Sequence, residues 1–302
     1  MSPRRTVLVT GASGFLGGHV VPWLRQAGYA VRTADRRQTG SIGARTDWRP
    51  LLRGVDAVVH LAARAHAPLR QGDAALLEEL EEINVRATGR LAAQAAASGV
   101  RRLVFVSSVK AMAESSTRPL TPDDPPCPAD PYGQAKLRAE AALAAAGGGM
   151  EQVILRPPLV YGAGVKGNFR SLLSWADRGW PLPFARVRSR RSLIYAGNLA
   201  DAIRAALEGP PGLWLPSDRQ DTGLPDLLRR LATALGRDCR LLPVPPALLR
   251  AAAQVTGQAG AARRLLDSLT VDGQMPDWTP PFTLDQGLTA TCRAWRRGIR
   301  AV

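Results

Sequence analysis

Tyr132 and Lys136 stand four residues apart in a chain that has only three lysines beside 37 arginines. At that spacing on a helix, the two side chains lie on one face. A tyrosine, with a pKa of about 10, is a poor base at neutral pH, but a nearby ammonium and a cationic nicotinamide both favour the phenolate. Ser107 and Ser108 end an apolar run 24 residues upstream of Tyr132, and a serine hydroxyl can hold a substrate oxygen in line. Together these residues predict proton transfer at a hydroxyl while a hydride passes to the nicotinamide.

A glycine-rich turn near the N-terminus predicts the dinucleotide site. It follows an apolar run at residues 6–10, opens a helical pattern and has the spacing Gly-x-x-Gly-x-x-Gly, one residue longer than the commonest fingerprint. The first glycine allows a tight turn, the second lets backbone approach a pyrophosphate, and the third lets helix pack on strand. The helix N-terminus offers free N–H groups to the phosphates. The cofactor-binding residues expected on this turn are Gly11, Ser13, Gly14, Phe15, Leu16 and Gly17.

Asp35 indicates which dinucleotide the chain prefers. It ends the second predicted strand, about 20 residues beyond the glycine turn, where a carboxylate can accept both hydroxyls of an adenine ribose. This favours NAD. Arg36 and Arg37 follow directly, and an arginine at that place can hold a 2′-phosphate, so NADP stays open. Arg36 is counted with Asp35 among the expected cofactor contacts.

The elements that must position these groups alternate between strand and helix. Strands are predicted at 6–10, 29–34, 57–61, 103–107 and 153–155, and helices at 15–26, 74–98 and 132–146. This alternation predicts an α/β fold with a Rossmann-like, doubly wound parallel sheet. Residues 192–197 and a helix at 199–207 are expected to return to the sheet. We expect a dinucleotide-binding domain over 1–156, with about 190–208 returning to it, and a smaller mixed, mainly substrate-binding lobe over 157–302.

Composition narrows the classes of partner. The formal charge is +15 and the sequence pI is about 11.1, which we attribute to GC-rich codon usage. The arginines are spread out and the few aromatics do not alternate with them, so no nucleic-acid partner is expected. Three distant cysteines without metal-ligand spacing predict no metal and a reducing cytoplasm. No stretch approaches the ~20 apolar residues of a membrane span.

The glycine turn, the strand-end serines and the Tyr-x-x-x-Lys pair, in this order, resemble the extended short-chain dehydrogenase/reductases of the nucleotide-sugar epimerase/dehydratase family. The resemblance covers nearly the whole chain. It implies that Ser108 supplies the catalytic hydroxyl, that Tyr132 is the base and that Lys136 binds the nicotinamide ribose. His60 is expected to pack rather than catalyse. Tyr132 and Lys136 also count as cofactor contacts, and the other contacts that the family implies are Ser41, Ile42, Leu61, Ala62, Ala63, Asn84, Ser107 and Pro157.

Two departures from the family pattern matter. Members that eliminate water carry Asp-Glu after the catalytic Thr, whereas Val109 and Lys110 follow Ser108, which argues against a 4,6-dehydratase. Many members also place an aspartate after the third strand to hold adenine. The matching stretch, Gly40-Ser41-Ile42, has serine, so adenine recognition is expected to rest on Ser41 and backbone groups.

The resemblance also implies a substrate site. Arg191 matches the arginine that holds the substrate diphosphate, and Asn168 would meet the diphosphate or the base. Lys110 and Lys166 are similar to residues of a subgroup that acts on UDP-N-acetylhexosamines in surface-polysaccharide synthesis, and that subgroup includes both 4-epimerases and 4-keto reductases. Alanine-rich helical segments at 91–97 and 137–146 correspond to the family's dimer helices, so a homodimer is expected.

The expected activity is an NAD-dependent epimerisation at carbon 4 of a UDP-hexose or UDP-N-acetylhexosamine through a transient 4-keto sugar. The alternative within the same class is an NAD(P)H-dependent 4-keto reductase of a UDP-deoxy-N-acetylhexosamine. A non-catalytic dinucleotide-sensing regulator is a remote alternative, because it has no need of Ser108, Tyr132 and Lys136 together.

Overall fold

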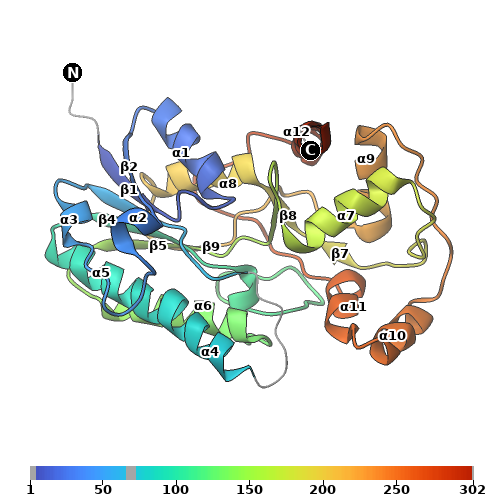
Figure 1. Ribbon diagram of the computed structural model, residues 1–302, viewed down its shortest axis with the longest axis horizontal. Coiled ribbons are helices and arrows are strands. Elements are labelled where there is room, and N and C mark those ends of the chain that lie inside the picture. Colours follow the sequence, from blue (N-terminus) through green and yellow to red (C-terminus); the bar gives the residue numbers. More distant parts are fainter. Residues whose placement is uncertain (1–4, 66–72, 301–302) are drawn as a thin grey trace.

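A six-stranded parallel sheet forms one half of the molecule, and a mainly helical second lobe forms the other (Figure 1). The computed structural model describes residues 5–65 and 73–300. In spatial order, the strands of the sheet are β2 (Ala30–Ala34), β1 (Thr6–Thr10), β3 (Ala57–His60), β4 (Arg102–Val106), β5 (Glu151–Leu155) and β9 (Gly212–Trp214). The predicted Rossmann-like α/β fold is confirmed.

The sheet is buried on both faces, as its continuous apolar runs predict. Val7, Leu8 and Val9 of β1 have no exposed surface. The order of the strands reverses between β1 and β3, because the chain goes from β1 outward to β2 and then crosses back to β3. In open sheets of this kind, ligands bind at the carboxyl ends of the strands beside such a reversal. Gly11 and Leu61 directly follow these two strands.

Helices cover both faces of the sheet. On one face, α1 (Gly17–Gln26) and α8 (Ala196–Ala206) share an apolar core with β1, β3 and β4. On the other face, α5 (Ala87–Ala97) and α6 (Pro131–Ala145) form a second core that Leu8 and Phe105 enter from the sheet. The short helices α2 (Arg36–Thr39) and α3 (Arg49–Leu52) lie between β2 and β3 in sequence. Because the strands are parallel, the turns that follow them all lie at the same edge of the sheet.

The helix predicted at 74–98 is present but is not uniform. α4 (Ala74–Leu80) continues through a π-helical segment, η1 (Glu81–Arg86), into α5. A π segment widens the helix locally and is frequently found at functional sites. Here it carries Asn84, a residue expected near the cofactor.

The expectation that residues 192–197 return to the central sheet is wrong. β8 (Leu193–Tyr195) pairs instead with β6 (Leu159–Tyr161) in a separate parallel pair. The sixth strand of the central sheet is β9, which pairs with β5 and was not expected. β8 is apolar enough for a buried strand, but its sequence does not say which strand it pairs with. The helix that follows, α8, does pack against α1, as expected.

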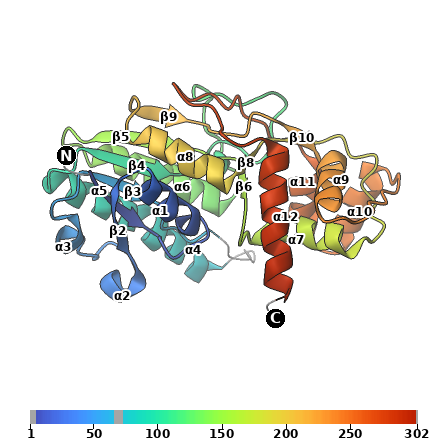
Figure 2. The same cartoon turned by 90° about the horizontal axis from the view of Figure 1, so that it is seen from above.

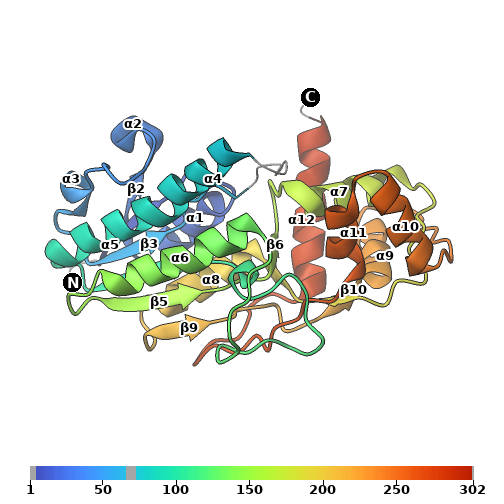
Figure 3. The ribbon, with the colours of Figure 1, turned by 90° about the horizontal axis from the view of Figure 1, so that it is seen from below.

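The second lobe contains four helices and a short antiparallel pair. The helices are α7 (Gly167–Arg178), α9 (Leu224–Ala234), α10 (Pro246–Val255) and α11 (Ala259–Leu266). The strands β7 (Arg190–Arg191) and β10 (Thr222–Gly223) form the pair. A final helix, α12 (Leu284–Arg300), runs along the junction between the lobe and the sheet half, as Figures 2 and 3 show. None of the described helices is both long and apolar enough to cross a membrane.

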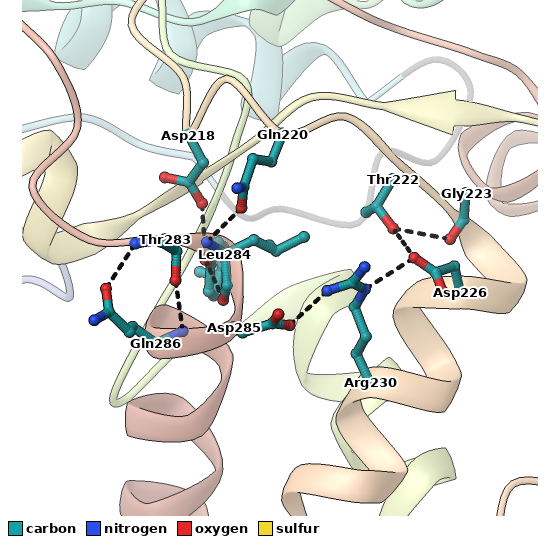
Figure 4. Close-up of polar contacts among 11 residues, drawn as sticks. Asp218, Gln220, Thr222, Gly223, Asp226, Arg230, Thr283, Leu284, Asp285 and Gln286 are labelled. Atoms are coloured by element: carbon teal, nitrogen blue, oxygen red, sulfur yellow. Dashed lines mark hydrogen bonds and ion pairs between the residues drawn. The ribbon is translucent and has the colours of Figure 1, made fainter.

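Polar contacts fix the start of α12 against the lobe (Figure 4). Arg230 of α9 bonds Asp285 at 2.6 Å and Asp226 at 2.9 Å. The amide of Leu284 donates to Gln220 Oε1 at 2.8 Å. Because the Arg230 pairs are largely exposed, their contribution to stability is about 0–1 kcal/mol each. Their role is to set the position of the helix.

Candidate active site

Helix α6 brings Tyr132 and Lys136 to the carboxyl end of β4. The helix begins at Pro131, and the Asp130 carboxylate caps it by accepting from the Gly133 amide at 2.7 Å. One turn later, Lys136 is 2% exposed, and its Nζ donates to the carbonyl of Val106, the last residue of β4, at 2.9 Å. The ammonium is therefore held at the sheet edge where ligands of this fold bind.

The protonation of this pair differs from the expectation in one respect. Burial lowers the pKa of Lys136 to about 8, and the nearby Glu140 carboxylate opposes that shift. Burial also raises the pKa of Tyr132 well above its ordinary value, and the Asp130 charge raises it further. The protein alone therefore keeps Tyr132 a neutral phenol, and the expected depression of its pKa by the ammonium does not occur among these residues. A cationic cofactor is needed to favour the phenolate.

The two serines after β4 are in different environments. Ser107 is buried, and its hydroxyl donates to Glu140 Oε1 at 2.5 Å. Ser108 is only half-buried and caps the 3₁₀ turn η2 (Val109–Ala111), its Oγ accepting from the Lys110 amide at 3.2 Å. Among the described residues, the Ser108 hydroxyl donates to no acceptor. Ser108 is thus the serine whose proton can be offered to a substrate oxygen.

A buried ion pair beneath the serines was not expected from the sequence. Arg156 donates through Nε to Glu140 Oε1 at 3.0 Å and through Nη2 to Oε2 at 2.5 Å, and both side chains are buried. A signal was present, since Glu140 continues the four-residue spacing of Tyr132 and Lys136 along α6. The pair fixes the orientation of Ser107, and through it the end of β4.

The glycine turn fits a dinucleotide pyrophosphate. Gly11 has φ +69°, and a Cβ there would lie 2.7 Å from the Ala62 amide nitrogen. A Cβ on Gly17 would overlap the backbone of Ala12. Helix α1 has no side-chain cap and no acidic residue in its first turn. The amides of Leu16 and Gly17 donate to no described residue, so they and the helix dipole are available to an anion. The surface that would receive the pyrophosphate is thus formed by backbone atoms of the glycine turn.

Replacing Gly17 with alanine is expected to lower the affinity for NAD by about tenfold or more, because the Ala12 backbone must move out of the turn that receives the phosphates. Gly18→Ala is the matched control, since open space surrounds that position and alanine suits a helix. Isothermal titration of both variants with NAD measures the difference. Equal affinities would show that the turn does not contact the dinucleotide.

Asp35 follows β2, but part of its carboxylate is already engaged. Oδ1 caps α2 by accepting from the amides of Arg37 at 2.9 Å and Gln38 at 3.2 Å. Neither bond uses Oδ2, which leaves that oxygen for a ribose hydroxyl. The Arg36 side chain is exposed beside it.

The placement of the Gly40-Ser41-Ile42 stretch needs a correction. It follows α2 and precedes β3, so it does not come after the third strand of the structure. Ser41 is exposed, and Ile42 packs against the core formed by α5 and α6. Ser41 is therefore the member of this stretch that remains accessible to an adenine.

The loop after β3 passes close to the glycine turn and is held from two sides. The Ala62 amide donates to Thr10 Oγ1 at 3.3 Å. Asn84 binds both backbone groups of Arg64, accepting from its amide at 2.8 Å and donating to its carbonyl at 3.1 Å. Asn84 is predicted to contact the cofactor. In the structure its side-chain amide binds this loop, and it thereby fixes the surface that Leu61, Ala62 and Ala63 form.

His60 lies under this loop in a fully buried polar contact. Its Nδ1 is 2.6 Å from Thr10 Oγ1 and its Nε2 is 3.0 Å from Thr88 Oγ1. Burial, aided by the positive charge of Lys136, lowers the pKa of His60 to about 3. The neutral ring joins three elements, which supports packing as its role.

His60 is expected to make the protein less stable as the pH falls below about 6.5. Its folded pKa is depressed to about 3, so the unfolded chain binds the proton first, and each pH unit below 6.5 costs about 1.4 kcal/mol from this group. Urea unfolding between pH 7.5 and pH 5 should show a shallower pH dependence in His60→Gln than in the wild type. His19→Gln, at a partly exposed histidine, is the control, and identical slopes in all three proteins would contradict the assignment.

The expected substrate residues fall into two groups. Lys110 is not free, since its Nζ is 2.5 Å from Asp130 Oδ2 and 3.2 Å from Glu114 Oε2. It therefore braces the cap of the helix that carries Tyr132. Lys166 and Asn168 are exposed at the start of α7, where they are accessible to a ligand.

Arg191 has guanidinium nitrogens that lack hydrogen-bond acceptors in the described structure. Its Nε and Nη2 are buried without a hydrogen-bond partner among the described residues, and burial lowers its pKa. The Glu114 and Asp267 carboxylates oppose this lowering of the Arg191 pKa, whereas the positive charge of Arg264 on α11 adds to it. The Nε of Arg264 is also buried and unpartnered within the described part of the chain. Unsatisfied guanidinium groups of this kind match the geometry of a phosphate. Arg264 was not among the expected site residues, and its sequence context, an ordinary amphipathic helix, gives no signal for it.

Backbone hydrogen bonds join the segment that follows β4 to the segment at the end of β5. The Val109 amide donates to the Pro157 carbonyl at 3.0 Å, and Ser107 N donates to Leu155 O at 2.7 Å. The turn that carries Ser108 thus lies beside the end of β5, where the expected contact Pro157 is buried. The structure brings Ser108, Lys136 and Pro157 to neighbouring strand ends, whereas Arg191 and Lys166 lie on the second lobe.

A family model, a sequence relative and solved structures all point to the same protein family. The model of the NAD dependent epimerase/dehydratase family matches residues 7–213. A UDP-glucose 4-epimerase of Vibrio cholerae is 35% identical in an alignment that covers 96% of this chain and 95% of that protein. The crystal structure of a UDP-glucose 4-epimerase from Thermotoga maritima with UDP-glucose superposes with a TM-score of 0.74 at 21% identity, covering 97% of this chain and 99% of the other.

A further solved structure, MoeE5 in complex with UDP-glucuronic acid and NAD, gives a TM-score of 0.74 at 26% identity, again covering 97% of this chain and 99% of the other. The family match extends over more than half of the chain and contains the glycine turn, Ser108, Tyr132 and Lys136. The chain therefore belongs to the NAD dependent epimerase/dehydratase family and is an NAD-dependent enzyme.

Proposed function

We propose that the protein is a nucleotide-sugar 4-epimerase that inverts carbon 4 of a UDP-hexose or UDP-N-acetylhexosamine, in the synthesis of a surface polysaccharide. The observation that carries the proposal is the position of Lys136 at the end of β4, with Tyr132 one turn before it and the free hydroxyl of Ser108 after the same strand. The similarity to the Vibrio cholerae UDP-glucose 4-epimerase supports the type of sugar nucleotide.

In this proposal each residue has a separate task. NAD bound at the glycine turn would supply the hydride acceptor for carbon 4 and the hydride donor for the opposite face of the 4-keto sugar. Tyr132 takes the proton from the 4-hydroxyl and later gives it back, and Ser108 donates a hydrogen bond to the same oxygen. Lys136, charged and fixed on the Val106 carbonyl, orients the nicotinamide ribose, and the positive charge of the bound cofactor would favour the phenolate of Tyr132.

The substrate diphosphate is assigned to Arg191, assisted by Arg264. Nε and Nη2 of Arg191 and Nε of Arg264 are buried without a partner among the described residues, and an anionic ligand beside them would offset the cost of that burial. Lys166 and Asn168 stand at the N-terminus of α7, where they would meet the nucleotide. Lys110 contributes through Asp130, by holding the first turn of α6.

Replacing Arg191 with alanine is expected to raise KM for the UDP-sugar by about tenfold or more with a smaller change in kcat, since a charge-assisted phosphate contact of about 1.5–3 kcal/mol is lost. Arg190→Ala is the matched control, because Arg190 is exposed and its side chain donates only to the Asp221 carbonyl in the described structure. Steady-state kinetics on both variants measures the effect. An unchanged KM in Arg191→Ala would remove this residue from the diphosphate site.

The alternative reaction, a 4-keto reductase, differs in what happens to the cofactor. The decisive experiment incubates the purified protein with UDP-GlcNAc, UDP-GalNAc, UDP-glucose or UDP-galactose without added cofactor. Interconversion of one pair supports the epimerase, because an epimerase regenerates its own NAD. No interconversion, together with stoichiometric oxidation of added NAD(P)H by a 4-keto sugar nucleotide, would replace the proposal with the reductase.

A homodimer is part of the proposal. Alanines on the outer faces of α5 and α6, among them Ala93, Ala97, Ala141 and Ala144, are exposed, and small side chains permit two copies of these helices to approach closely. Sedimentation equilibrium would then report a species of twice the 32.3 kDa chain mass.

A further inference from the structure

Four of the five exposed large apolar side chains among the described residues belong to the second lobe. They are Trp180, Leu242, Leu248 and Val255, which are 59%, 48%, 60% and 89% exposed. The fifth, Leu77, lies on α4 in the sheet half. Single exposed apolar residues are normal, but a group of them marks an interaction surface.

Helix α10 carries this group in a regular pattern. Leu248, Ala251, Ala252 and Val255 are all exposed, and their spacing places them on one face of the helix. No residue of α10 is buried, and Leu249 on its other side packs partly against the lobe core. A surface helix normally turns its apolar face inward, whereas α10 presents one to the outside.

Trp180 and Leu242 are exposed on two other segments of the same lobe. Their segments pair through backbone bonds, with Leu182 N donating to Arg240 O at 2.9 Å and Leu242 N donating to Leu182 O at 2.8 Å. Figures 1, 2 and 3 all place α10 at the end of the molecule remote from β2. We call this surface the apolar tip, made up of Trp180, Leu242, Leu248, Ala251, Ala252 and Val255.

The charges around the apolar tip are almost all positive. The Arg178 guanidinium lies 4.9 Å from the ring centroid of Trp180. Asp238 is the one exposed acidic residue within 178–190 and 237–263. The same two segments contribute the exposed residues Arg178, Arg186, Arg188, Arg190, Arg237, Arg240, Arg250 and Arg263. Of these, Arg250 is paired with Asp267 at 2.7 Å, and Arg237 is paired with Asp177 at 3.4 Å.

We propose that the apolar tip docks on an anionic lipid bilayer. The exposed Leu248 and Val255 on one face of α10 suit an interfacial membrane helix, whose apolar side enters the boundary between headgroups and acyl chains. Trp180, elsewhere on the lobe, is a residue type that favours the same boundary. The arginine rim matches anionic headgroups. The proposal is independent of the enzymatic reaction. It places α11, with Arg264, next to the bilayer, because α10 and α11 pack on one another.

Co-sedimentation with vesicles tests the docking. The full chain should sediment with vesicles of phosphatidylglycerol and phosphatidylcholine and not with phosphatidylcholine alone, and high salt should release it. Leu248→Gln with Val255→Gln should lower the vesicle partition coefficient by about tenfold or more. Both positions are exposed, so the fold should persist, as circular dichroism would verify.

Leu77→Gln is the matched control, since it removes the exposed leucine of the other half of the molecule and should bind vesicles like the wild type. Absence of binding to anionic vesicles would overturn the proposal, as would equal binding by the double variant. Self-association of the vesicle-free protein that disappears in the double variant would also overturn it, because the apolar tip would then be a contact between copies of this chain.

Discussion

The variant Tyr132→Phe is expected to convert nucleotide sugars about 10²–10⁴-fold more slowly than the wild type, because it removes the group that we propose takes and returns the hydroxyl proton. The phenol oxygen has no hydrogen-bond partner among the described residues, so its loss should not disturb the fold. The affinity for NAD should stay within a few-fold of the wild type. Rates at saturating sugar, with NAD titrations in parallel, measure both quantities.

The matched control is Tyr29→Phe. Tyr29 precedes β2, and its hydroxyl donates to Glu208 at 2.6 Å, so this variant also loses one phenol oxygen but far from Lys136. It should retain wild-type rates. Sugar conversion that continued unchanged in Tyr132→Phe would remove the proton-transfer role from this residue, whereas a loss in both variants would point to a general loss of structure.

A second large effect is expected at the buried ion pair. Glu140→Ala should lower the free energy of unfolding by about 3–5 kcal/mol, because it leaves the Arg156 guanidinium buried without its carboxylate. The Ser107 hydroxyl loses its acceptor in the same variant. Urea unfolding at pH 7.5, monitored by circular dichroism, measures the change.

Two comparisons make this prediction specific. Glu151→Ala also breaks an arginine pair, but Glu151 is half exposed and Arg102 keeps the Ala206 and Gly209 carbonyls as acceptors, so a loss of about 1 kcal/mol or less is expected. The double variant Glu140→Leu with Arg156→Leu should recover part of the stability, since no unpaired charge remains. A loss below about 1 kcal/mol in Glu140→Ala would show that the pair is not buried in solution.

The sheet and the turns that follow it could be predicted because their signals are local. Apolar runs identify β1, β3 and β4, and glycines with a required geometry, such as Gly11, mark the turn after β1. Pairing is not local. β8 and β9 are each three residues long, and which strand each one joins depends on the path of the intervening chain through the second lobe.

The candidate site was predictable in its residue types but not in its energetics. The spacing of Tyr132 and Lys136 gives their common face, yet only the fold reveals that burial raises one pKa and lowers the other. Likewise, the sequence predicts ligand contacts for Asn84 and Lys110 but gives no sign of the bonds that the structure shows them making to Arg64 and Asp130. Contacts between distant segments decide such roles, and spacing alone does not report them.

The late position of β9 has a consequence for synthesis on the ribosome. Until residues 212–214 have been translated, β5 has a partner on one side only, and its other edge presents unpaired backbone groups that can recruit a second nascent chain. More than fifty residues, including α7 of the second lobe, must emerge between the two strands. The sheet is therefore completed after the lobe has begun to form, so a pause in translation within the lobe would expose an aggregation-prone edge.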